Sequence, residues 1–132
     1  MRLNQVTVGC TDYAASVEFY RCLGLILIVD SPPRYARFET QSGETFSIHQ
    51  VEQVSRPTSV VYFEVETLDE TVAGLKGAGL KFILDPVDQS WGWREARLLD
   101  PAGNEICLFW GGENRRYPPW RIDGSGSKAT KE

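Results

Sequence analysis

The chain has one histidine, His49, and three cysteines, at positions 10, 22 and 107. A single histidine excludes a zinc site built from several imidazoles, and the cysteines form no CxxC pair. An odd number of widely spaced cysteines makes no disulfide framework and is typical of reduced, mostly buried thiols. Because an imidazole can exchange protons near neutral pH, His49 is the first candidate for proton transfer.

Other common catalytic signatures are missing from the sequence. It contains no phosphate-binding loop, no dinucleotide-binding fingerprint and no GxSxG nucleophile elbow. The carboxylates likewise form no pair that indicates glycoside hydrolysis. The chemistry therefore depends on groups that only the fold can bring together.

Length and composition describe an ordinary globular domain. The 132 residues suffice for one domain, and 42% of them are hydrophobic. Fourteen basic against eighteen acidic residues give a formal net charge of −4, which argues against nucleic acid as the main partner. No apolar run is long enough for a membrane span, and the first residues lead into no signal-peptide core. We expect a cytoplasmic protein with no membrane partner.

Two segments of the chain repeat. Residues 6–25 align with residues 61–80 at an offset of 55, and residues 43–49 align with residues 103–109 at an offset of 60. Identity between the copies is low, but the pattern agrees over both halves. This agreement favours a duplicated module.

Each half predicts the same order of elements. The first half reads as a strand at 4–10, a helix at 14–23 and strands at 25–30, 34–41 and 45–51. The second reads as a strand at 60–66, a helix at 69–78 and strands at 80–84, 94–99 and 105–110. The predicted fold is α+β, with two tandem βαβββ modules forming a curved open sheet and helices on its outer face.

The pattern changes towards the C-terminus. The predicted domain covers residues 1–112, with modules at about 3–54 and 58–111. Residues 113–123, the C-terminal arm, are rich in arginine and aromatic residues but show neither strand nor helix period. We expect the arm to pack on the domain or on a second subunit of a homodimer, and the tail at 124–132 to be disordered.

Several motifs together resemble one known superfamily. They are Gln5-Val6-Thr7-Val8, Asp12, Phe19-Tyr20-Arg21, Leu23-Gly24-Leu25, Phe63-Glu64-Val65, Trp91-Gly92, Arg94 and Asp100-Pro101-Ala102-Gly103-Asn104. The set resembles the vicinal oxygen chelate superfamily, which includes glyoxalases, bleomycin resistance proteins and extradiol dioxygenases. The resemblance covers about residues 3–111 and implies the fold more strongly than any one reaction.

The resemblance also implies where a metal would be held. Metal-dependent members use four side chains from the first, fourth, fifth and eighth strands, and the matching positions here are Gln5, Ser47, Val60 and Cys107. Valine cannot coordinate a metal and serine is a weak neutral donor, so we predict no metal at this place. The fallback is a zinc, nickel, manganese or iron ion held by Gln5, His49 and Cys107.

Strand alternation places further side chains on the cleft side of the sheet. The expected ligand-binding residues are Gln5, Thr7, Tyr62, Trp91, Trp93, Glu105, Cys107 and Phe109, with His49 and Glu64 as candidate catalytic bases. Each has a structural alternative. Cys107 can be an apolar filler, the two tryptophans can be buried anchors of a turn, and His49 can lie at the sheet's edge, bonded to a carbonyl or water.

Three functions are compatible with these residues. The first, which we favour, is metal-free binding or sequestration of an aromatic or planar small molecule. The second is a divalent-metal lyase, isomerase or dioxygenase of glyoxalase type. The third is a metal-independent enzyme with His49 or Glu64 as its base.

Overall fold

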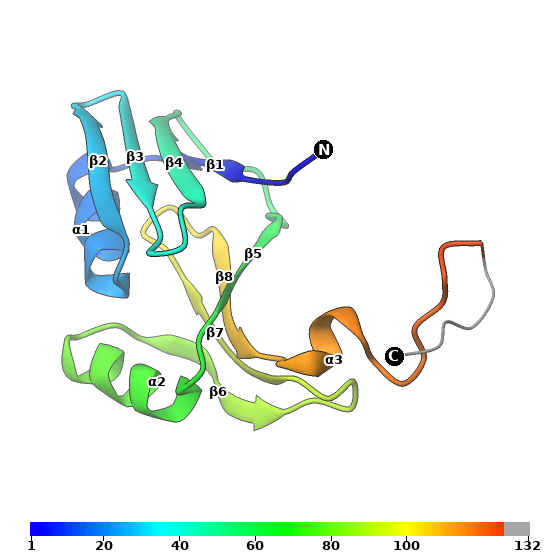
Figure 1. The fold of residues 1–132 in the computed structure, drawn as a ribbon. Coiled ribbons are helices and arrows are strands. Elements are labelled where there is room, and N and C mark those ends of the chain that lie inside the picture. The colour runs from blue at the N-terminus through cyan, green and yellow to red at the C-terminus, as the bar shows by residue number, and fades with distance from the viewer. Residues whose placement is uncertain (126–132) are drawn as a thin grey trace.

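Two four-stranded sheets and three helices make up the computed structural model, which describes residues 1–125 (Figure 1). The first half comprises β1 (Gln5–Cys10), α1 (Tyr13–Leu23), β2 (Ile26–Ser31), β3 (Tyr35–Glu39) and β4 (Thr45–Gln50). The second comprises β5 (Val60–Glu64), α2 (Leu68–Gly77), β6 (Phe82–Asp88), β7 (Arg94–Leu99) and β8 (Glu105–Trp110), followed by α3 (Glu113–Arg116).

Both sheets have the same topology. Their strand orders are β1-β4-β3-β2 and β5-β8-β7-β6, and in each the first and last strands of the module pair in parallel. The remaining pairs are antiparallel. The duplicated βαβββ arrangement predicted from the sequence is confirmed, and the sheets do not close into a barrel.

Local signals in the sequence account for both helices. Asp12 caps α1 by accepting a hydrogen bond from the Ala15 N–H, and Gly24 ends it with a φ of 113°. Helix α2 buries Leu68, Val72 and Leu75, a stripe at helical spacing. Each helix therefore lies with its apolar side against its own sheet.

The halves share one hydrophobic core. Phe46 of β4 meets Phe63 of β5 edge to face, with ring centroids 5.8 Å apart. The buried Tyr20 hydroxyl donates to Asp100 in the β7–β8 turn at 2.5 Å, and the Asn104 amide donates to the Gly9 carbonyl at 2.8 Å. These three contacts join the two modules.

Two elements differ from their predictions. Strand β6 runs to Asp88 rather than ending at residue 84, because the chain continues through Pro86 with irregular pairing to β7. The start of the arm forms the short helix α3, where no helix was expected, and this segment projects from the end of β8 (Figure 1). The predicted disordered tail lies, from residue 126 onwards, outside the described residues.

No helix within residues 1–125 has the length and apolarity that a membrane span requires.

Candidate functional site: an aromatic groove and a buried ion network

The open face of the second sheet carries most of the predicted site. Tyr62 on β5 lies opposite Cys107 on β8, and Glu64 lies opposite Phe109, as strand alternation predicts. Glu105 is on the same face, two residues before Cys107. The second sheet therefore presents these side chains together.

Three aromatic rings form a cluster on this face. Trp93 stacks on Phe109 with centroids 4.4 Å apart, and Tyr62 meets both rings edge to face at 6.0 and 5.8 Å. Phe109 is only 4% exposed, whereas Tyr62 is 47% exposed. The cluster has a buried base and a solvent-facing ring, an arrangement suited to stacking against a planar molecule.

The cluster borders a groove between β1 and β5. The groove encloses about 820 Å³. Residues of both sheets and of the segments next to them line it: Leu3, Asn4, Gln5, Val6, Thr40, Ser42, Glu44, Thr45, Phe46, Val61, Tyr62, Phe63, Glu64, Glu66, Trp93, Phe109, Trp110 and Arg115. The Thr45 hydroxyl donates to the Gln5 amide oxygen at 2.7 Å, which orients the amide nitrogen as a donor. The groove combines apolar walls with a few polar groups, as small-molecule sites do.

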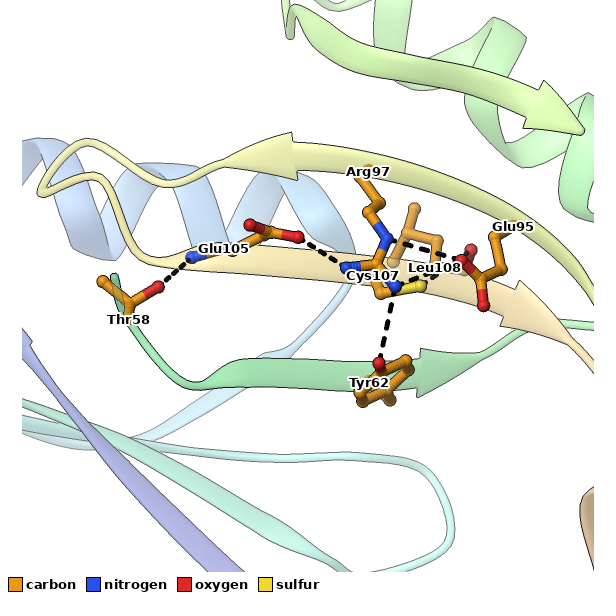
Figure 2. Close-up of polar contacts among 7 residues, drawn as sticks. All are labelled: Thr58, Tyr62, Glu95, Arg97, Glu105, Cys107 and Leu108. Carbon is orange, nitrogen blue, oxygen red and sulfur yellow. Dashed lines mark hydrogen bonds and ion pairs between the residues drawn. The ribbon is translucent and has the colours of Figure 1, made fainter. Parts of the chain in front are cut away.

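A partly buried ion network lies beside Tyr62, the exposed ring of the cluster (Figure 2). Arg97 donates to Glu105 at 2.5 Å and to Glu95 at 3.1 Å, and its Nη2 lies 3.4 Å from the Tyr62 hydroxyl oxygen. Glu95 is 1% exposed, so Arg97 supplies the charge that this carboxylate needs. Burial opposes its charge, but these hydrogen bonds raise the pKa of Arg97 above its ordinary value.

Cys107 lies beneath this network and is fully buried. Burial, with a contribution from the charge of Glu95, raises the pKa of the Cys107 thiol to about 12. A thiol in this state is a poor nucleophile and a poor metal ligand at neutral pH. The geometry favours the apolar filler over the nucleophile.

Glu64 holds the segment that leads into α3. Its carboxylate accepts hydrogen bonds from the N–H groups of Gly111 at 3.1 Å and Gly112 at 3.2 Å, and lies 3.7 Å from the Arg115 guanidinium. These contacts tie β5 to the beginning of α3. A carboxylate with three such partners is poorly placed to act as a general base.

Of the predicted residues of the first sheet, Gln5 lines the same groove as the aromatic cluster, whereas Thr7 and His49 do not. Thr7 and the buried Ser47 share a hydrogen bond of 2.6 Å. His49 is exposed and pairs across the strands with Tyr35 and Gly9. Strand β4 is internal in its sheet, so the alternative that placed His49 at the sheet's edge is wrong, and no side chain or backbone group within residues 1–125 hydrogen-bonds to the imidazole.

The two tryptophans of the β6–β7 turn separate. Trp93 packs on Phe109 and its indole N–H donates to the Asn114 carbonyl at 3.4 Å. Trp91 is 40% exposed and does not line the groove. The expectation of buried indoles thus applies at most to Trp93, which is itself half-buried.

The residues present do not fit a divalent metal. Val60 offers no donor atom, Cys107 is a buried thiol, and Ser47 is bonded to Thr7. Within residues 1–125, no group of three or more His, Cys, Asp or Glu side chains is placed to hold an ion. These side chains therefore offer no ligand set of the kind that a divalent ion requires.

Sequence reasoning missed the arginines of this face. Arg37 lies opposite Ser47, and Arg97 lies opposite Cys107. At the 60-residue offset of the repeat, Arg37 aligns with Arg97 and Ser47 aligns with Cys107. Extending that offset upstream of residue 43 would have found them.

A sequence profile decides the family. The profile of the Glyoxalase/Bleomycin resistance protein/Dioxygenase superfamily matches residues 2–108. The chain belongs to this superfamily. Comparison of this glyoxalase-superfamily chain with curated protein sequences finds no significant match.

Solved structures share the fold of this superfamily member. A glyoxalase/bleomycin resistance protein/dioxygenase family enzyme from Burkholderia phytofirmans PsJN has a TM-score of 0.70 and 22% identity, over 83% of this chain and 98% of that one. TioX from Micromonospora sp. ML1 has a TM-score of 0.71 and 18% identity, over 85% and 100%. Lactoylglutathione lyase from Agrobacterium tumefaciens has a TM-score of 0.70 and 16% identity, over 83% and 93%. At these identities the likeness establishes the fold alone.

Proposed function

We propose that this superfamily member binds a planar or aromatic small molecule in the groove between β1 and β5, without a metal ion. The observation that carries the proposal is the cluster of Tyr62, Trp93 and Phe109 on the groove wall. An exposed ring beside a stacked pair, of which Phe109 is buried and Trp93 half-buried, offers a preorganised aromatic surface. Stacking of this kind contributes about 0.5–1.5 kcal/mol beyond the burial of area.

Polar groups around the cluster would orient the ligand. The Tyr62 hydroxyl oxygen faces a donor of Arg97, so its own proton is directed elsewhere and is available to a ligand acceptor. Across the groove, the Gln5 amide nitrogen is a second donor. Two donors beside an aromatic surface suit a ligand that carries carbonyl or hydroxyl oxygens.

The groove lacks an available general base or nucleophile among the predicted groups, which favours sequestration of the ligand over its chemical conversion. Of the two candidate bases, Glu64 is engaged by α3, and His49 does not line the groove. Cys107 is a buried thiol of raised pKa. Binding needs none of these groups to react.

Intrinsic tryptophan fluorescence of EDTA-treated protein tests the proposal, because Trp93 lies in the groove. A panel of planar aromatic compounds is titrated, and saturable quenching with a Kd in the micromolar range is expected for some of them. Tyr62→Ala should weaken binding by about 10-fold, since one stacking partner is lost. The matched control is Tyr117→Ala on the C-terminal arm, which should leave the Kd unchanged because Tyr117 is outside the groove.

Other outcomes would assign the alternative functions. Turnover that EDTA abolishes and one metal restores would support the glyoxalase-type enzyme. Turnover that is indifferent to EDTA but lost in His49→Ala or Glu64→Gln would support the metal-independent enzyme. No saturable binding across the panel, with the variants folded, would overturn the proposal.

We also propose that the chain forms a homodimer through its C-terminal arm. Tyr117, Trp120 and Ile122 of the C-terminal arm are exposed apolar side chains, 37%, 56% and 52% accessible. Such a group on a short arm is suited to contact with a second subunit.

A further inference from the structure

Arg37 occupies the centre of the open face of the first sheet. Its Nε donates to the Tyr35 hydroxyl at 2.8 Å, and its guanidinium lies 5.5 Å from the Tyr35 ring centroid. Across the strand pair it lies opposite Ser47, which is fully buried and bonded to Thr7. Arg37 is thus held in place by a phenol and sits above a floor of hydroxyl groups.

The duplicated half shows what is unusual about this arginine. Its counterpart Arg97 is held by Glu95 and Glu105. At the same 60-residue offset, the positions beside Arg37 are Tyr35 and Thr45, which carry no charge at neutral pH. The second half neutralises its arginine, and the first half does not.

In the described part of the chain, the charge of the Arg37 guanidinium is not paired with a carboxylate, and most of its N–H donors have no hydrogen-bond acceptor. Among residues 1–125, no carboxylate lies within ion-pair distance of Arg37, and its one hydrogen bond uses Nε. Glu39 is on the same face but two residues along β3, about 7 Å away by strand spacing. The four N–H groups on Nη1 and Nη2 therefore form an open fork, the geometry that binds carboxylate and phosphoryl oxygens.

Neighbouring side chains add donors to this fork. His49 lies opposite Tyr35 and is the diagonal neighbour of Arg37, about 7–8 Å away between backbones. Thr7, on the next strand, is exposed. Burial alone would raise the pKa of Tyr35, but hydrogen bonds from Ser47 and Arg37 and the charge of Arg37 lower it below its ordinary value of 10.0. The surroundings of Arg37 thus favour negative charge.

We infer that Arg37, with His49 and Thr7 beside it, is an anion anchor that binds a carboxylate or phosphoryl group of the ligand. The inference rests on the proposed ligand-binding function and names the ligand class as an anionic aromatic compound. Ser47 is two residues, about 7 Å, along β4 from Thr45, which lines the groove. A substituent that extends from the groove past Thr45 along β4 would approach Arg37, which lies opposite Ser47.

Calorimetric titration with three probes at fixed ionic strength tests the anchor. The probes are phenylphosphonate, benzyl alcohol as its neutral counterpart, and inorganic phosphate. The wild type should prefer phenylphosphonate to benzyl alcohol. Arg37→Gln should weaken phenylphosphonate and phosphate binding on the order of 10- to 100-fold and leave benzyl alcohol unchanged. Arg37→Lys should fall between, because it keeps the charge and loses the fork.

The matched control is Arg34→Gln, which removes the same charge from the exposed β2–β3 turn and should change each Kd less than twofold. Thermal melts confirm that each variant is folded. The anchor is overturned if Arg37→Gln behaves like Arg34→Gln, or if the wild type shows no preference for the anionic probes.

The outcomes separate the anchor from the proposed function. Benzyl alcohol and other neutral aromatics that bind while neither anion does would refute the anchor and leave the function standing. Phosphate binding that depends on Arg37, without any gain from the phenyl group or any loss in Tyr62→Ala, would support the anchor and refute the aromatic site. A free inorganic anion as the natural ligand would give this second pattern.

Discussion

Arg97 and the buried carboxylate of Glu95 form an ion pair of 3.1 Å (Figure 2), on the face of the second sheet that also carries Tyr62 and Phe109. Only 22% of the Arg97 side chain and 2% of the Glu95 side chain are exposed. Arg97→Gln leaves a buried charge without its partner and should lower the free energy of unfolding by about 2–3 kcal/mol. Urea denaturation measures the change.

Arg37→Gln is the control for this prediction, because the same substitution at the equivalent position removes no ion pair among the described residues. Its cost should be less than about 1 kcal/mol. Equal losses in the two variants would show that the pairing with Glu95 does not stabilise the sheet.

The contact between the halves gives a second prediction. Tyr20 is fully buried and donates to Asp100, which also accepts from the backbone of Ala102 and Asn104. Tyr20→Phe removes one donor from a buried carboxylate and should cost about 1–3 kcal/mol by chemical denaturation. Tyr13→Phe, which removes the bond of an exposed pair with Asp30, should cost clearly less. The reverse order would contradict the role of Tyr20 in joining the modules.

Cys107 makes stability depend on alkaline pH. Its pKa is raised from the ordinary 9.0 to about 12 in the folded protein, so the folded state retains a proton that the unfolded state loses. The stabilisation is complete below about pH 9 and is lost as the pH rises towards 12, at a limiting slope of about 1.4 kcal/mol per pH unit.

The wild type should therefore lose unfolding free energy more steeply than Cys107→Ala over this range, in urea titrations at several pH values. Cys22→Ala, at a half-buried position, is the control. Parallel curves for the wild type and Cys107→Ala would show that the thiol titrates freely.

Glu64 gives a prediction about the arm. Glu64→Ala removes the acceptor for the Gly111 and Gly112 N–H groups and the partner of Arg115. Hydrogen exchange of the amides from Gly111 to Tyr117 should accelerate by about 10-fold or more, because two N–H groups each lose a hydrogen bond to a charged acceptor. Glu66→Ala, an exposed neighbour, should leave exchange unchanged, and equal rates in both variants would refute the anchoring role.

The fold was predictable because its signals are local. Alternating strands, the stripe of Leu68, Val72 and Leu75, the Asp12 cap and the left-handed Gly24 each depend on a few neighbouring residues. Helix α3 was not predictable in the same way. Its four residues are too few to show a period, and the N-cap Gly112 is held by Glu64, a side chain 48 residues earlier.

The site was predictable only to the level of faces. Alternation placed Tyr62, Cys107 and Phe109 on one side correctly. It could not show that Trp93 stacks on Phe109 while Trp91 faces solvent, because that depends on the turn between β6 and β7. Nor does alternation along a single strand show that Arg97 lies opposite Cys107, since cross-strand partners depend on the register between β7 and β8.

Metal-free binding is tested by the melting temperature of untagged, EDTA-treated protein. The temperature is measured for the protein alone, with each of Ni, Zn, Mn, Fe(II) and Co, and with an aromatic ligand in the absence and presence of each metal. Any molecule that binds only the folded state raises this temperature by mass action. If binding needs no metal, the melting temperature should rise saturably with the ligand, equally with and without metal, and should not rise with metal alone. A saturable rise with one metal alone, removed by Cys107→Ala or His49→Ala, would contradict metal-free binding.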